Sequence, residues 1–154
     1  FLMQYIRKFH KKYPNIIFEI HTDPTHVLKD KLKSGNLDFI IAKFPLKKKD
    51  EFEYTCIGSM QDIFVVNKDY KELLKKPLYI TNIEKYPILL KKQPSSSRDF
   101  IENHCQKYGL ELTSIMEIAS ARLLIEFTKV GYGIGVVTKE YVRNELKRKE
   151  MVVK

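Results

Sequence analysis

Short apolar runs alternate with amphipathic helical patterns along most of this sequence. The runs NIIFEI at 15–20 and LDFIIA at 37–42 are rich in β-branched and aromatic residues, as buried strands are. Between them, DPTHVLKDKLKSG has apolar residues at helical spacing, with Asp23 predicted as the N-cap and Gly35 as the end of the helix. This alternation predicts an α/β fold built on a parallel sheet.

The same pattern continues through the rest of the chain. Strands are predicted at 52–58, 62–67, 86–91, 114–119 and 134–138, and helices at 69–76, 97–108, 120–130 and 139–149. A capping box from Ser96 to Asp99 is predicted to open the helix at 97–108. An opening helix is predicted from one apolar stripe, formed by Phe1, Leu2, Tyr5, Ile6, Phe9 and Tyr13. With 154 residues, the chain can form one ordinary domain or two small lobes that share a core.

Gly131, Gly133 and Gly135 stand at alternate positions in the stretch KVGYGIGVVT. A dinucleotide-binding motif needs a strand, a glycine turn and a helix N-terminus in that order. Here a predicted helix precedes the glycines and a predicted strand follows them, and the spacing lacks the two-residue gap of the motif. We therefore expect Gly131 to end the helix in the left-handed conformation, and we expect no nucleotide here.

The composition bounds the partners of the chain. The formal net charge is +9, but lysines occur in nearly every predicted loop and helix with few interleaved arginines or aromatics, which favours a solvated surface over a nucleic-acid platform. No apolar run approaches the roughly 20 residues of a membrane span. The histidines show no HExxH or related spacing, so we expect no metal site. Cys56 and Cys105 are predicted to be buried free thiols, which favours a reducing cytoplasm.

Two segments, LKSGNLD at 32–38 and VGYGIGVV at 130–137, occur in this order with YPILL and a serine run between them. On these segments the chain resembles, over almost its whole length, the effector-binding domain of LysR-type transcriptional regulators. The resemblance implies an α/β fold of two Rossmann-like lobes with mixed sheets joined by hinge strands, similar to type 2 periplasmic binding proteins. Lobe I is expected at 1–66 and 135–154, and lobe II at 67–134.

The resemblance also implies partners. In such regulators a small molecule binds between the lobes and changes how a DNA-binding oligomer engages its operator. We therefore expect a small-molecule effector, which can be anionic, and a homodimer or homotetramer. Tyr5 and Phe9 on the opening helix are candidate contacts between subunits. We expect DNA contact only through an N-terminal helix-turn-helix that is absent from this sequence, as the first regulatory strand is, and we expect no contact with a membrane.

Candidate effector-binding residues come from two predicted helix N-termini and one strand end. The serine run offers hydroxyls and free amides that suit a carboxylate or phosphate, although helix capping alone explains one serine equally well. By resemblance, Thr25 lies in the turn of the first lobe that faces this run. Lys43 follows the predicted strand 37–42, where some family members place a cation, but it can equally be one more surface lysine. The candidates are Thr25, Lys43, Pro94, Ser95, Ser96 and Ser97.

Catalysis has little support in the sequence. No Ser-His-Asp set, nucleophile elbow or carboxylate pair is evident, and Glu117 stands alone in a predicted strand. We therefore expect no enzyme, no catalytic residue and no cofactor. The alternative to a regulator is a solute-binding protein of a transporter with the same fold. An upstream export signal would favour the transporter, whereas an upstream helix-turn-helix would favour the regulator.

Overall fold

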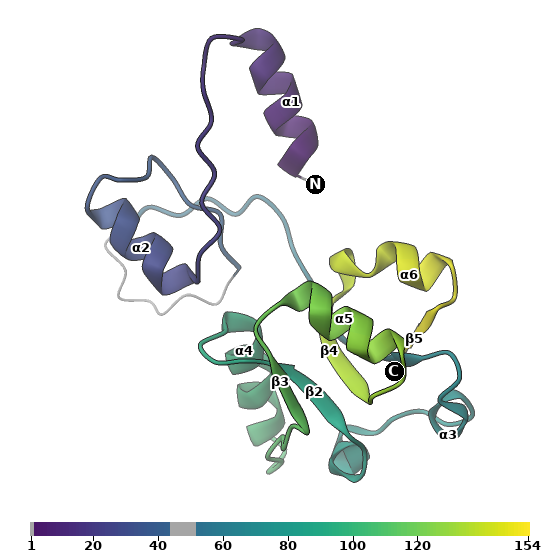
Figure 1. Cartoon of the computed structure of the whole chain (residues 1–154). Coiled ribbons are helices and arrows are strands. Elements are labelled where there is room, and N and C mark those ends of the chain that lie inside the picture. Colours follow the sequence, from purple (N-terminus) through teal and green to yellow (C-terminus); the bar gives the residue numbers. More distant parts are fainter. Residues whose placement is uncertain (1, 44–51) are drawn as a thin grey trace. The chain divides into compact units, whose positions relative to one another are not determined.

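A computed structural model describes residues 2–43 and 52–154 of the chain (Figure 1). Contacts within the chain divide it into two compact units, Phe1–Ile40 and Ile41–Lys154. The first unit holds two helices, and the second holds a five-stranded sheet with the remaining helices.

The first unit consists of α1 (Leu2–Lys12), α2 (Thr25–Lys33) and the segment that joins them. α1 confirms the predicted opening helix. The Phe9 ring packs against the rings of Tyr13 and Phe18, with centroids 4.8 and 5.7 Å apart. These contacts tie the end of α1 to the chain that follows it.

The start of α2 differs from the prediction. Pro24 occupies the N-cap position and no side chain caps the helix. The Asp23 carboxylate instead accepts a hydrogen bond from Lys31 at 2.7 Å, so the prediction that Asp23 is the N-cap was wrong. Gly35, just beyond the helix, has a φ of +74° and donates its N–H to Leu32, which confirms its predicted place at the helix end.

Three predicted strands, at 15–20, 37–42 and 52–58, form no strand in the described residues. Their apolar side chains remain in contact with solvent, and Ile17 and Phe39 are 93% and 73% exposed. A strand is stabilised by hydrogen bonds to a neighbour, and the sheet of the second unit does not include these segments. The pattern identified residues that suit a sheet but could not show whether a partner strand lies beside them.

The sheet of the second unit is mixed and has the order β3-β2-β4-β1-β5. Its strands are β1 (Asp62–Asn67), β2 (Ile88–Lys91), β3 (Met116–Ile118), β4 (Ile134–Thr138) and β5 (Met151–Val153). β2 pairs in parallel with β3 and β4, whereas β1 pairs antiparallel with β4 and β5. The sheet joins strands from both predicted lobes, and the lobe boundaries at 1–66, 67–134 and 135–154 stay a prediction.

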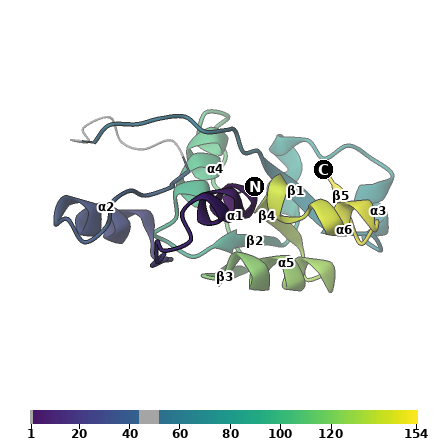
Figure 2. The same ribbon diagram turned by 90° about the horizontal axis from the view of Figure 1, so that it is seen from above.

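Helices cover both faces of this sheet (Figure 2). On one face, α4 (Ser96–Gln106) buries Ile101 and Cys105 against Leu90, together with α3 (Lys71–Leu74) and the 3₁₀ helix η1 (Ile80–Lys85). On the other face, α5 (Ala121–Lys129) buries Leu124 against Leu89. The alternation of Leu89 and Leu90 between the two clusters is the period of two that a strand imposes. Each fully buried leucine contributes about 1.5–3 kcal/mol.

The three alternate glycines have three different structural roles. Gly131 follows α5 with a φ of +87°, which confirms the predicted left-handed helix end. Gly133 lies against the backbone of Pro87, and Gly135 lies against the side chain of Thr128, so neither position has room for a β-carbon. The order of helix, glycines and strand β4 is the reverse of a dinucleotide-binding turn.

Two further predictions need correction. The predicted helix at 139–149 is divided into the 3₁₀ helix η2 (Lys139–Tyr141) and α6 (Arg143–Lys147), because Val142 is buried and has a non-helical backbone. Cys56 is an exposed free thiol, because the segment around it joins no sheet, whereas Cys105 is buried as predicted. None of the helices in the described ranges is long and apolar enough to cross a membrane.

Candidate ligand-binding site

Several polar side chains gather at one edge of the sheet in the second unit. The parallel strands β2, β3 and β4 end at this edge with Lys91, Ile118 and Thr138 (Figure 1). The antiparallel strand β1 begins there, with Asp62 in register with Thr138. Open α/β sheets bind ligands at the carboxyl ends of their parallel strands, so this edge is the candidate site.

The turn 94–97, called the serine turn here, leads from β2 into α4. It begins with a cis peptide bond between Gln93 and Pro94. Ser95 is the N-cap, and its hydroxyl accepts a hydrogen bond from the N–H of Arg98 at 3.5 Å and lies 3.1 Å from the Ser97 hydroxyl. The predicted capping box from Ser96 to Asp99 was therefore wrong by one residue, since the helix already begins at Ser96.

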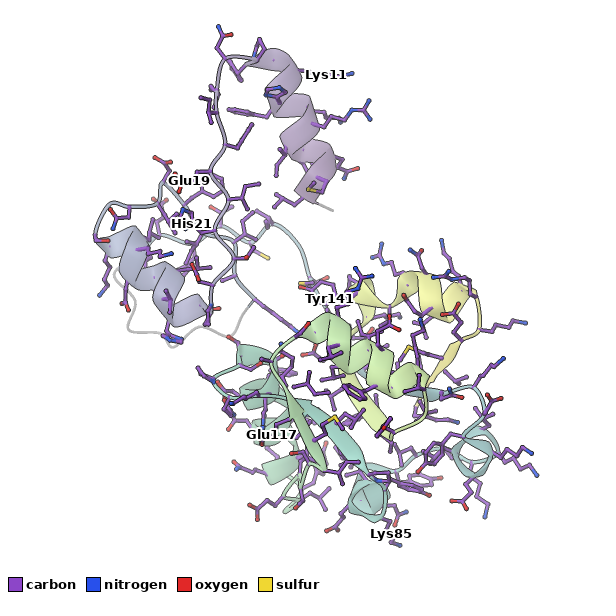
Figure 3. All side chains as sticks on the ribbon, in the orientation of Figure 1. Lys11, Glu19, His21, Lys85, Glu117 and Tyr141 are labelled. Atoms are coloured by element: carbon purple, nitrogen blue, oxygen red, sulfur yellow. The ribbon has the colours of Figure 1, made fainter. Side chains whose placement is uncertain are left out.

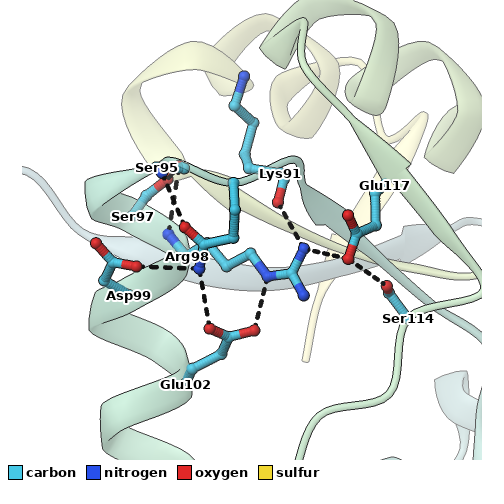
Figure 4. A network of polar contacts seen from close by, with 9 residues as sticks. Lys91, Ser95, Ser97, Arg98, Asp99, Glu102, Ser114 and Glu117 are labelled. Atoms are coloured by element: carbon cyan, nitrogen blue, oxygen red, sulfur yellow. Dashed lines mark hydrogen bonds and ion pairs between the residues drawn. The ribbon is translucent and has the colours of Figure 1, made fainter. Parts of the chain in front are cut away.

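Arg98 fixes this turn to the sheet (Figure 4). Its Nε donates to Glu102 at 2.6 Å, and its terminal nitrogen donates to the Lys91 carbonyl at 3.1 Å and to Glu117 on β3. Burial alone lowers the pKa of Arg98, but the hydrogen bonds and charges of Glu102 and Glu117 outweigh it and raise that pKa above the ordinary value. Arg98 thus ties α4 to β2 and β3 and is fully engaged in structure.

Gln93 completes the support of the serine turn. Its side-chain oxygen accepts from the Ser95 N–H at 3.1 Å, and its amide nitrogen donates to Asp99 at 3.0 Å and to Glu102 at 3.2 Å. The turn is therefore positioned by side chains before it and after it. The spacing of Arg98 and Glu102, four residues apart on a predicted helix, was the one sequence signal for this network.

Lys91 places a second cation at the same edge, and sequence reasoning missed it. Its ammonium donates to the carbonyl of Ala119, next to Ser120, the N-cap of α5. Burial lowers the pKa of Lys91. In Figure 4 the Lys91 side chain points away from Arg98, so the two cations are not part of one cluster.

Lys43 is engaged with two partners in the second unit. Its ammonium donates to Oδ1 of Asp62 and, at 3.3 Å, to the hydroxyl of Thr138. Thr138 in turn donates to the same Asp62 oxygen at 2.9 Å. The second carboxylate oxygen of Asp62, Oδ2, is buried and has no hydrogen-bond partner among the described residues. The predicted role of Lys43 toward an anionic effector stays a prediction.

Thr25 lies in the first unit, at the first position of α2. Charged side chains come just before it in the sequence and on α2. The Asp23 carboxylate accepts a hydrogen bond from Lys31, and this bond lowers the pKa of Asp23. His21 lies beside Glu19 on the chain before α2 (Figure 3), with 2.8 Å between Nε2 and Oε1. Lys31 also lies 3.2 Å from Nδ1 of His21. The predicted contribution of Thr25 to effector binding stays a prediction.

Metal binding gains no support from this arrangement. Across residues 2–43 and 52–154, no group of three or more His, Cys, Asp or Glu side chains is placed to hold a metal ion. The groups at the sheet edge include hydroxyls, helix amides, the ammonium groups of Lys43 and Lys91, and the buried carboxylate of Asp62. They can form hydrogen bonds with a small polar molecule, and the class of protein they define is a small-molecule-binding α/β domain.

Comparison with known proteins identifies the family. The LysR substrate binding domain model matches residues 1–154, and the chain belongs to this family. The uncharacterized HTH-type transcriptional regulator YybE of Bacillus subtilis (strain 168) is 22% identical over 132 residues, covering 86% of this chain and 45% of that protein. YfeR of Shigella flexneri, with the same description, is 22% identical over 134 residues, covering 87% and 43%. The chain thus spans less than half the length of these relatives.

Solved structures share the fold. The regulatory domain of CcmR from Synechocystis PCC6803, in complex with 2-PG, has a TM-score of 0.84 at 16% identity, covering 99% of this chain and 73% of that one. The effector binding domain of QuiR, in complex with shikimate, has a TM-score of 0.83 at 16% identity, covering 99% and 72%. These likenesses confirm the expected fold class, an α/β fold with a mixed sheet of the type 2 periplasmic-binding-protein kind.

Proposed function

We propose that this chain is the ligand-sensing regulatory domain of a LysR-type transcriptional regulator. It binds a small metabolite and thereby controls DNA binding by a separate domain. The observation that carries the proposal is the family match over residues 1–154. Ligand complexes of CcmR and QuiR, which have the same fold, support it.

In the second unit, the proposed contact with the ligand is the serine turn. The first amides of a helix have no partner within the helix, and they carry the positive end of its dipole. In α4 the Arg98 N–H donates to the Ser95 hydroxyl. The N–H groups of Ser96 and Ser97 lie at the N-terminus of the helix. These amides and the serine hydroxyls suit a carboxylate or phosphate group, so we propose an organic acid or a phosphate as the ligand.

We also propose that the protein forms an oligomer and that the part of it that contacts DNA is not in this sequence. α1 presents Tyr5 and Phe9, which are 51% and 43% exposed, and aromatic side chains are enriched at protein interfaces. The net charge of +9 does not itself supply sequence-specific DNA binding, because base reading requires an element placed in a groove.

Ligand binding and DNA binding can be tested together on the full-length protein. A panel of organic acids and organic phosphates is screened by thermal shift, and each hit is added to a DNA-binding assay with the promoter of the regulator. We expect a hit to change DNA affinity, to lose affinity in Ser97→Ala, and to keep it in the control Ser59→Ala, an exposed serine. Ser95→Ala should in addition cost about 0.5–2 kcal/mol of stability, because Ser95 is the N-cap. If no compound changes DNA affinity, the proposed function is wrong.

A further inference from the structure

We propose that a hollow in the second unit, lined by α3, by η1 and by the chain between them, is a second ligand site that binds an aromatic carboxylate. Tyr86, which leads into β2, lines this hollow, whereas the serine turn follows the other end of β2. The inference therefore does not depend on the ligand proposed for the serine turn.

The hollow has the size and the access of a small-molecule site. Its volume is about 420 Å³, and small-molecule sites have volumes of about 300–1,000 Å³. Its deeper part is apolar, since Leu73 is 2% exposed and Leu78 and Tyr86 are half-buried. Lys76 and Lys85 are exposed, so the hollow is open to solvent on their side.

The walls of the hollow are held by the core of the unit. Leu73 of α3 and Ile83 of η1 belong to one buried cluster, and Tyr86 packs against that cluster. The Tyr86 ring also lies edge-on to the ring of Tyr70, with 6.4 Å between the centroids. Packing therefore fixes the lining elements without a ligand, and binding does not have to order them first.

The lysines at the hollow lack partners. Neither Lys76 nor Lys85, the last residue of η1 (Figure 3), forms a hydrogen bond or an ion pair with a described residue. Among the described lining residues, Glu72 alone is acidic. It stands four residues before Lys76, but α3 ends at Leu74 and the two side chains form no ion pair. Two ammonium groups against one carboxylate favour an anion, to which the half-buried Asn82 can add a hydrogen bond.

The apolar part of the lining favours a ring on this anion. Tyr79 and Tyr86 contribute aromatic rings, which pack well against another ring, and Leu78 adds aliphatic surface. A small inorganic anion would leave this surface uncovered, and a neutral ring would leave the lysines unpaired. A neighbouring hollow of about 380 Å³ shares residues 76–78, but its described lining contains no aromatic side chain. The hollow beside η1 is therefore the one that suits an aromatic carboxylate.

Matched probes test the inference on the full-length protein. Benzoate, phenylacetate and 3-phenylpropionate place the carboxylate at increasing distance from the ring, and isothermal titration compares each with its neutral amide and with acetate. We expect at least one of the three acids to bind roughly fivefold or more tightly than its amide, because the amide forms no ion pair with the lysines. Acetate should bind more weakly than this acid, because it covers none of the apolar lining.

Variants with matched controls assign the binding to the hollow. Lys76→Gln and Lys85→Gln should each weaken binding of the acid roughly two- to fivefold, whereas Lys75→Gln, outside this lining, should leave it nearly unchanged. Glu72→Gln should strengthen binding, because it removes the one repelling carboxylate of the described lining, whereas Glu84→Gln should not. All five side chains are exposed, so we expect these variants to fold.

The outcomes separate this site from the serine turn. The ring of the bound acid should shift the methyl NMR signals of Leu73 and Leu78, and Ser97→Ala should leave this binding unchanged. Binding that Ser97→Ala abolishes, and that the lysine variants do not affect, would place the probes at the serine turn; it would overturn this inference and not the proposed function. Equal binding of the acids and their amides, or binding by none of the three acids, would also overturn the inference.

Discussion

The buried hydroxyl of Thr128 occupies the space where a β-carbon at position 135 would lie. Gly135 thus allows α5 to approach β4 closely, and the Thr128 hydroxyl keeps its own bond to the Leu124 carbonyl at 2.9 Å. We predict that Gly135→Ala destabilises the protein by about 1–3 kcal/mol, because the added methyl group overpacks this contact. Urea denaturation measures the loss.

A double-mutant cycle shows how much of the destabilisation by Gly135→Ala comes from overlap with Thr128 and how much from the change in backbone freedom. Thr128→Ala removes Oγ1, the atom nearest to the added β-carbon, and Cγ2, and it keeps only Cβ at 3.2 Å, so Gly135→Ala should cost clearly less in that background. Gly109 is the matched control: its φ is +70° with open space around it, and Gly109→Ala should cost about 1–2 kcal/mol in either background. Additive costs for positions 128 and 135 would show that the close approach is not the cause.

Arg98 is predicted to be the residue whose loss most affects the support of the serine turn. Its guanidinium side chain is 11% exposed and contacts Glu102, Glu117 and the Lys91 carbonyl. Arg98→Met should reduce the free energy of unfolding by about 1–3 kcal/mol, because it removes the charged donor that Glu102, Glu117 and the Lys91 carbonyl share.

Arg122 gives the comparison for this variant, since it is an exposed arginine on α5. Arg122→Met should change the free energy of unfolding by no more than about 0.5 kcal/mol. Chemical denaturation of both variants provides the measurement. Equal effects of the two substitutions would mean that the network around Arg98 contributes no net stability.

Sequence patterns predicted strands β1 to β4 of the second unit and the α-helices between them well, because these elements pack against one another. The strand at 134–138, the helix at 120–130 and the left-handed Gly131 are each determined by local residues and by a neighbour inside the same unit. The segments at 15–20, 37–42 and 52–58 carry an equally strong strand pattern but pair with no strand in the described residues. Strand propensity shows that a segment suits a sheet. Whether a neighbouring strand lies beside it depends on the tertiary structure.

Residue patterns within a short stretch of sequence predicted one part of the candidate site, the serine turn. Serine hydroxyls and free amides at a helix start are local features, so the serine turn was found, although the N-cap is Ser95. Asp62, Lys91 and Glu117 come together with their partners through strand pairing, over separations of up to 76 residues in the case of Asp62 and Thr138. No local pattern marks such contacts, and the place of Lys43 after the predicted strand at 37–42 made it a candidate without indicating its pairing with Asp62.

The two cysteines are predicted to react at very different rates. Cys56 is exposed, whereas Cys105 is fully buried in the core beneath α4, where burial raises the pKa of its thiol. Since the thiolate is the reactive form, iodoacetamide near neutral pH should label Cys56 and spare Cys105 until the protein unfolds. Mass spectrometry locates the label, and Cys56→Ser should abolish the fast reaction. Labelling of Cys105 in native protein at the rate of Cys56 would contradict its burial.

Asp23 is predicted to titrate below an ordinary aspartate, whose pKa is about 3.9. The hydrogen bond from Lys31 lowers its pKa, because it stabilises the charged carboxylate in the folded state. The stability from this pair is therefore fully present above pH about 4, and it is lost as pH falls through the lower, folded-state pKa.

Carboxyl ¹³C NMR shifts of Asp23 follow the titration directly. In Lys31→Met the pKa should rise toward the ordinary value, whereas Lys68→Met, in the second unit, should leave it unchanged. An Asp23 titration that is the same in the unaltered protein and in Lys31→Met would rule out this pairing in solution.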